Sequence, residues 1–185
     1  MKNLSFSNKL KDIISPNKIF TSLISIKKQI LISFSFYFIG IIVGMFLSRN
    51  QEYTTNPQNL KFAYIFFNNY RLSILIIIIG LITVGIGSSI MLFTNGVILG
   101  DILIGVFNKY SVWPILTGVA PHFIFEISAL CIATSISYES IRFIRLLLDK
   151  NYTNKVHIGR ILSNFVTMTV LFFVAALIET NIAHI

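Results

Sequence analysis

Charged side chains are scarce in this sequence: they make up 12% of its 185 residues, and only seven of them are acidic. Hydrophobic residues make up 55%, and the mean hydropathy is +0.78. A soluble domain needs a mostly polar surface, so this composition excludes one and is typical of an integral membrane protein. Because the apolar runs have the length of membrane-spanning helices, we predict an all-α, polytopic helical bundle.

Cysteine and histidine are almost absent. The single cysteine, Cys131, has no disulfide partner within the chain, and the three histidines show no zinc-binding spacing. The Gly-x-Ser-x-Gly and His-Glu-x-x-His motifs, the P-loop and the dinucleotide-binding fingerprint are also missing. We therefore predict no catalytic residue, no metal site and no cofactor, which counts against an enzyme without excluding one.

The basic excess gives a net charge of +8, which could indicate nucleic-acid binding. Here, however, the lysines and arginines flank apolar segments instead of clustering on a soluble module. Their expected counter-charge is the anionic headgroups of the lipid bilayer, and we predict no nucleic-acid partner.

Long apolar runs, by contrast, are plentiful. A helix needs about 20 apolar residues to cross a bilayer, and three uncharged stretches meet this length, with room for two more crossings before the last. We predict five spans, at residues 30–48, 72–93, 96–113, 115–137 and 161–180. Together they form a transmembrane domain at 29–185, which makes the chain a multi-pass protein of the plasma membrane.

Lysine and arginine positions predict the orientation, because cytoplasmic segments keep the excess of these residues. With the N-terminus inside, eleven of the 15 basic residues fall on the cytoplasmic side. Only Arg49, Lys61, Arg71 and Lys109 fall outside. We therefore predict a cytoplasmic N-terminus and an external C-terminus.

Residues 1–28 form a basic segment ahead of the first span. Apolar residues recur in it at helical spacing, and Pro16 divides it into two pieces. Such a segment can lie in the cytoplasmic interface with its lysines near lipid phosphates, whereas a frayed tail that only enforces topology is the alternative. The apolar run that follows ends without an Ala-x-Ala cleavage site, so we expect the segment to be retained.

A second stretch, at residues 139–150, is predicted to form a cytoplasmic helical extension or surface helix.

Glycines are concentrated within the predicted spans, where they allow helix backbones to approach closely. The positions that we assign to helix packing are Gly40, Gly44, Gly80, Gly85 and Gly87. Compact packing within the chain is the simplest interpretation. A homo-oligomer with Gly40 and Gly44 at the subunit contact is the alternative.

A tight turn is predicted at the inner end of the second span. Asn95 and Gly96 both tolerate a positive φ, which suits such a turn. Gly100 follows at a spacing that suits close helix packing. Asp101 would then lie one turn into the next helix, where the helix dipole stabilises a carboxylate.

Asparagine and arginine residues precede the second span. Asn68 or Asn69 could cap the N-terminus of that helix, because an asparagine oxygen accepts from free backbone N–H groups. A cap needs only one asparagine. We therefore expect the second amide and Arg71 to bind an acidic group on another helix.

Glu126 is the most informative polar residue, because an ionised group inside a bilayer must be paired, protonated or facing water. It shares a face of the fourth span with His122, four residues earlier. We predict that Glu126 couples to Arg71 and His122, with Glu179 at a comparable depth in the fifth span. A clamp that holds the helices in register, proton or ion handling, and catalysis or metal binding remain as alternative roles for this intramembrane polar cluster.

Taken in order, these motifs resemble those of the stage II sporulation protein M family of polytopic membrane proteins, from the first span onward. The resemblance rests on a glycine-rich second span and on Asn68-Asn69-x-Arg71, Asn95-Gly96-x-x-Leu99-Gly100, Pro121-His122-x-x-x-Glu126 and Ala175-Ala176-x-x-Glu179. Phe123 departs from the pattern, because the family commonly has glycine at that position.

The resemblance implies a helical membrane fold that works through partner proteins. Family members of sporulating bacteria serve in a membrane complex with peptidoglycan-degrading partners, whereas the Pro121-His122-x-x-x-Glu126 residues make this chain more similar to the non-sporulation branch. We expect a non-enzymatic scaffold or accessory protein that binds other membrane proteins. The alternatives are maturation, secretion or immunity for a circular bacteriocin, with its precursor as partner, and a small-solute, ion or proton carrier that uses Glu126.

Overall fold

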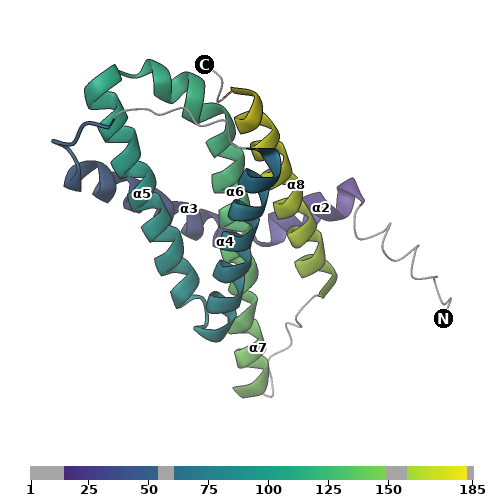
Figure 1. Ribbon diagram of the computed structural model, residues 1–185. Helices are drawn as coiled ribbons and strands as arrows, with labels where there is room; N and C mark the ends of the chain where they lie inside the picture. Colours follow the sequence, from purple (N-terminus) through teal and green to yellow (C-terminus); the bar gives the residue numbers. More distant parts are fainter. Residues whose placement is uncertain (1–14, 54–60, 149–157, 183–185) are drawn as a thin grey trace.

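The computed structural model describes residues 15–53, 61–148 and 158–182. Every regular element in these ranges is helical, and Figure 1 shows their arrangement. The elements are α2 (Pro16–Ser25), α3 (Lys27–Leu47), α4 (Phe62–Ile82), α5 (Ile86–Tyr110), the π-helix η1 (Ile115–Val119), α6 (Ala120–Ser137), α7 (Glu139–Leu148) and α8 (Ile158–Ile182). Five helical segments are long and apolar enough to cross a membrane, which confirms the predicted all-α polytopic bundle.

Three of the predicted spans agree with observed helices to within three residues. These are 30–48 with α3, 115–137 with η1 and α6, and 161–180 with α8. Helix α7 follows α6 after a single turn residue, so the predicted helical stretch at 139–150 is also present in its described part. Charged and polar residues flank α3, α7 and the end of α6, and Pro114 precedes η1, so composition and proline position could locate these boundaries.

The second and third spans were predicted in the wrong register. The structure has α4 at Phe62–Ile82 and α5 at Ile86–Tyr110, with a turn at residues 83–85, in place of spans at 72–93 and 96–113. Asn95 and Gly96 therefore lie inside α5 and not in a turn. The turn lies within an uncharged run, so neither charge nor hydropathy indicates its position. The Asn95-Gly96 pair has a higher turn preference, and for this reason the turn was predicted there.

The turn between α4 and α5 depends on residues with left-handed backbone conformation. Val84 has φ 56° and Gly85 has φ 87°. Glycine adopts such angles without steric cost, and the Gly85 N–H donates to the Gly80 carbonyl at 2.6 Å. A Cβ at Gly85 would also overlap the ring of Tyr138, so this turn packs directly against the end of α6.

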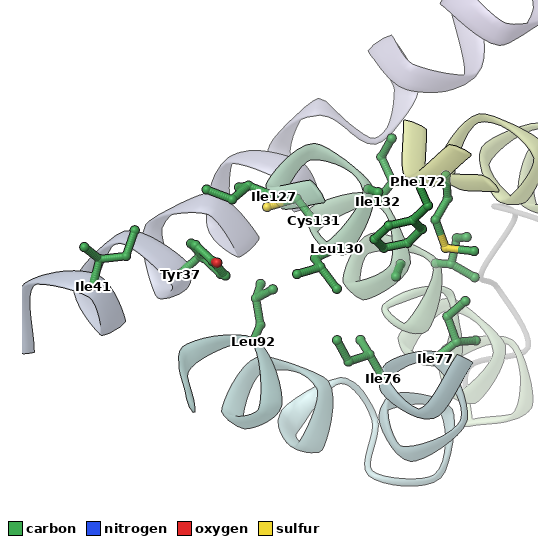
Figure 2. Close-up of a cluster of buried hydrophobic side chains, with 14 residues drawn as sticks. Tyr37, Ile41, Ile76, Ile77, Leu92, Ile127, Leu130, Cys131, Ile132 and Phe172 are labelled. Atoms are coloured by element: carbon green, nitrogen blue, oxygen red, sulfur yellow. The ribbon is translucent and has the colours of Figure 1, made fainter. Parts of the chain in front are cut away.

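Helix α6 forms the centre of the bundle. It packs against α3, α4, α5 and α8, and it is buried all round from Ala129 to Ser137. Figure 2 shows Leu130 and its neighbours on α6 between Tyr37 of α3 and Phe172 of α8. A helix with apolar residues on every side and such complete burial holds the other spans in place.

The backbones of helices α3 and α5 lie in direct contact. A Cβ at Gly40 or Gly44 would overlap backbone atoms of α5, and a Cβ at Gly96 or Gly100 would overlap backbone atoms of α3. Small residues at this spacing allow such contact. The face with Gly40 and Gly44 is thus filled by α5 of the same chain, which supports packing within the chain over a subunit contact there.

Helix α2, the first helix of the described residues, packs against the start of α8. Ser22 is buried there, and its hydroxyl donates to the Asn164 side-chain oxygen at 2.7 Å. Phe20 and Ile24 are exposed on the other side of α2. The predicted interfacial residues between 1 and 14 lie outside the described part of the chain, so only the second piece of this segment is seen.

Candidate functional site

Polar side chains from α4, α6 and α8 meet at one end of the bundle. They line a pocket of about 170 Å³, which we call the polar pocket. Its lining residues are Tyr64, Ile65, Asn68 and Asn69 of α4, His122 and Glu126 of α6, and Glu179 of α8. Five of the six residues of the predicted intramembrane polar cluster therefore lie together in this pocket. The sixth, Arg71, is not among the lining residues.

The pairing of Glu126 differs from the prediction. The Asn69 side-chain amide donates a hydrogen bond to Oε1 of Glu126, linking α4 to α6. Asn69 reaches Glu126 because α4 begins at Phe62, which places it two turns inside the helix instead of at its cap. The N-cap position is Lys61, so neither asparagine caps this helix. The amide meets part of the hydrogen-bonding requirement of a carboxyl group that is taken out of water.

His122 lies one turn before Glu126 and lines the same pocket. Pro121 occupies the first turn of α6, where its missing N–H is tolerated, and the π-helix η1 precedes it. The buried Nδ1 atom of His122 has no hydrogen-bond partner in the described residues. His122 thus brings a buried, unsatisfied nitrogen to the wall of the polar pocket.

Glu179 brings a second carboxyl group to the polar pocket from α8. It lines the same small pocket as Glu126. Two carboxylates in a small, partly buried space repel each other unless a proton or a cation lies between them. In the described part of the chain no group of three histidine, cysteine, aspartate or glutamate side chains has the arrangement of a metal site. The two carboxyl groups make the pocket suited to hydrogen-bond donors, or to a proton or one small cation between them.

Arg71 lies on the outward side of α4 and is exposed. Its neighbours on that side are Tyr64, Phe67 and Asn68, of which Tyr64 is 63% and Phe67 65% exposed. These four residues stand at positions i, i+3, i+4 and i+7 and therefore share one side of the helix. We call this surface the α4 exposed face. The predicted coupling of Arg71 to Glu126 is not present in the described residues: Asn69 faces Glu126, and Arg71, two residues later, lies about 200° further around α4.

The remaining predicted polar residues lie in the middle of α5. Asp101 accepts a hydrogen bond from the Tyr53 hydroxyl at 2.8 Å, and Asn95 accepts one from Tyr37 at 3.2 Å. The bond to Asp101 raises the pKa of Tyr53 above its usual value. Asp101 thus anchors the segment after α3, and it does not lie in the first turn of a helix as predicted.

Several polar contacts between helices were missed from the sequence. Ser88 bonds Ser137 at 2.7 Å, and Ser89 bonds the Tyr138 hydroxyl at 2.7 Å, so serines join α5 to the end of α6. Serine and tyrosine within apolar spans are the signal for such bonds, because a hydroxyl in a bilayer needs a partner. No local motif marks which pairs meet.

Comparison with known proteins identifies a family. The family model described as Stage II sporulation protein M matches residues 16–184. No curated protein and no solved structure was found to match the chain. The match spans all five membrane-crossing helices and both the α4 and α6 polar motifs. The chain therefore belongs to the stage II sporulation protein M family.

Proposed function

We propose that this protein is a scaffold or accessory subunit of the plasma membrane that binds partner membrane proteins through the α4 exposed face. The observation that carries the proposal is the exposure of Asn68 and Arg71 on a helix that crosses the membrane. Polar and charged groups on such a helix normally face the bundle or a wet cavity. Here Asn69 is hydrogen-bonded within the bundle, whereas Asn68, at the rim of the polar pocket, and Arg71 are exposed.

The cost of this arrangement favours a partner over lipid. Arg71 lies about 14 Å along the α4 axis from Phe62, which makes a long route to the headgroups for a snorkelling side chain. An unpaired arginine at the bilayer centre costs about 2.5–3.5 kcal/mol even on insertion scales. An acidic or carbonyl-rich surface on a second membrane protein would remove this cost.

The composition of the α4 exposed face agrees with a protein contact. Tyrosine, phenylalanine and arginine are the residue types enriched at the centres of protein interfaces. Tyr64 and Phe67 supply rigid aromatic area, and Arg71 supplies a guanidinium that recognises a carboxylate through two hydrogen bonds. The partner that fits is a transmembrane helix with an acidic residue at the depth of Arg71.

Site-specific photo-crosslinking in native membranes tests this proposal. A photoreactive phenylalanine analogue at Phe67 should give a discrete crosslinked protein. Arg71→Ala should reduce the yield at least about five-fold, which corresponds to about 1 kcal/mol. The matched control is the same analogue at Ile98, which is 55% exposed on α5. Crosslinking to lipid alone at both positions would contradict the proposal.

The genes that neighbour this one distinguish the kinds of partner. Peptidoglycan hydrolase or sporulation genes would favour a scaffold for cell-envelope enzymes. A short precursor peptide beside a transporter would instead favour maturation, secretion or immunity for a circular bacteriocin. Either neighbourhood names the candidate whose acidic transmembrane residue should be exchanged in the crosslinking experiment.

A carrier for protons or small cations is the second candidate function, and the polar pocket is the observation that favours it. Glu126 and Glu179 face the same small space, which one cation or proton could occupy. Proton or cation flux into proteoliposomes that contain the wild-type protein, and its loss with Glu126→Gln, would support the carrier. Equal flux with the wild type and Glu126→Gln, or no flux with either, would favour the scaffold.

A further inference from the structure

A second polar surface lies at the other end of the bundle from the polar pocket. It is a groove of about 360 Å³ between the start of α3 and helix α7. Gln29 and Ile32 of α3, Tyr138 of the turn after α6, and Ile141, Arg142 and Arg145 of α7 line it. Two guanidinium groups and an amide therefore face a space that also has an apolar side.

An apolar groove of about 340 Å³ continues along α3. It is lined by Phe36 and Ile39 of α3 and by Ile86, Ser89, Ile90 and Phe93 of α5. Phe36, Ile39 and Ile90 are between 41% and 60% exposed, so the groove is open on the side of the bundle. It lacks charged residues entirely along its described lining.

The two grooves form one continuous track. Gln29, Ile32, Phe36 and Ile39 follow one another at intervals of three and four residues, which places them on a single face of α3. Ser89 lines the apolar groove, and its hydroxyl is 2.7 Å from the Tyr138 hydroxyl that borders the basic one. The track thus changes from basic to apolar along α3.

The length of this track matches one leaflet. Gln29 and Ile39 are separated by about 15 Å at helical rise, and half of the hydrocarbon core is about 15 Å thick. A tyrosine at the junction of the polar and apolar parts is typical of the depth at which headgroup and acyl chain meet. These dimensions fit a phospholipid with its headgroup at α7.

The charges at the basic end are arranged for an anion. Arg142 forms an ion pair with Glu139, 2.5 Å away, which fixes the direction of its guanidinium. Arg145, one turn further, is exposed and forms no ion pair within the described residues. Lys27 and Lys28 precede Gln29 in the first turn of α3 and are also exposed. Four basic side chains therefore stand against one acidic side chain, Glu139, at this end of the track, which favours an anion.

We propose that this track is a binding site for an anionic phospholipid. Its phosphate is bound by Arg145 and by the free edge of the Arg142 guanidinium, and one acyl chain lies along Ile32, Phe36 and Ile39. Basic pockets between helices at the cytoplasmic side are suited to such headgroups. The expected orientation places this end on that side, where anionic lipids are concentrated.

The test is a titration of the purified full-length protein in neutral detergent with phosphatidylglycerol or phosphatidylcholine, read by native mass spectrometry. Phosphatidylglycerol should bind more tightly. Arg145→Gln should weaken it about five-fold, because one basic contact to an anionic headgroup is lost. Lys109→Gln, which removes an exposed basic residue at the other end of α5, should leave binding unchanged.

A second pair of variants tests the acyl chain. Ile90→Trp fills the apolar groove and should weaken phosphatidylglycerol binding, whereas Ile98→Trp at a similarly exposed position of α5 should not. Equal binding of the two lipids, or an unchanged affinity in Arg145→Gln, would overturn the proposal. Competition by glycerol 3-phosphate as strong as that by phosphatidylglycerol would also overturn it, because the site would then bind phosphate without a chain.

Discussion

Neighbouring residues of α4 have separate roles. Asn69 points into the bundle and donates to Glu126, whereas Asn68 lies at the rim of the polar pocket and Arg71 faces outward. A shift of one residue along a helix rotates a side chain by about 100°. The internal polar contact and the α4 exposed face can therefore be altered independently by single substitutions.

The first prediction separates these roles by stability. Asn69→Ala leaves the Glu126 carboxyl without its donor, and should lower the free energy of unfolding by about 1 kcal/mol, the average for a hydrogen bond in a folded protein. Arg71→Ala should change it by less than about 0.5 kcal/mol, as for an exposed position. Unfolding of the purified protein in mixed micelles measures both. A larger loss in Arg71→Ala than in Asn69→Ala would show that Arg71 has the internal role.

The sequence located most of the polar pocket but not its pairing. His122 and Glu126 share a face at any register of the fourth helix, so their proximity needed only their spacing. Which α4 residue reaches them depends on where that helix begins, and the predicted start at 72 was ten residues late. Arg71 was predicted as the partner because its charge complements Glu126. Its position in the helix, however, places its side chain on the side of α4 that faces away from Glu126.

At the scale of elements, the contact between α3 and α5 depends on glycine. These helices approach so closely that a single Cβ would overlap backbone atoms of the facing helix at four positions. Backbone cannot move aside as a flexible side chain can. The same contact explains why Asn95 and Gly96 are helical: Gly96 lies against α3, and Asn95 accepts from Tyr37. Tertiary packing here prevails over local turn preference.

The second prediction tests this packing. Gly96→Ala should destabilise the protein by about 1–3 kcal/mol, the range for overpacking a close contact. Gly118→Ala is the matched control, because no atom lies within 4 Å of a Cβ built there. Thermal unfolding in detergent compares the two. Equal melting temperatures would mean that α3 and α5 are further apart than described.

The third prediction tests the position of the turn. Cysteines are introduced one at a time into a Cys131→Ser background and exposed to a membrane-impermeant thiol reagent. Ser111→Cys should be labelled in intact cells, and Val84→Cys only after permeabilisation, because the two turns are expected on opposite sides of the membrane. Asn95→Cys, within α5, should resist labelling in both. Rapid labelling of Asn95→Cys, together with no labelling of Val84→Cys, would contradict this position and support a turn at residues 95–96.

At the scale of the whole molecule, the bundle has two surfaces that face outward at opposite ends. One is the α4 exposed face beside the polar pocket, and the other is the basic and apolar track along α3. Composition alone predicted five crossings, because each is a long run with few charges. It could not predict these surfaces. The track combines residues of α3, α5 and α7 that only the fold brings together, and the outward side of α4 depends on how that helix packs against its neighbours.

The most direct test of partner binding through the α4 exposed face is the crosslinking yield from Phe67 in native membranes. This yield is compared among wild type, Arg71→Ala and Asn69→Ala at matched protein levels. We predict a loss of at least about five-fold in Arg71→Ala with an unchanged melting temperature. Asn69→Ala should lower the melting temperature and keep most of the crosslink. An undiminished crosslink in Arg71→Ala, or loss of crosslink only in parallel with stability, would contradict a partner-binding role for the α4 exposed face.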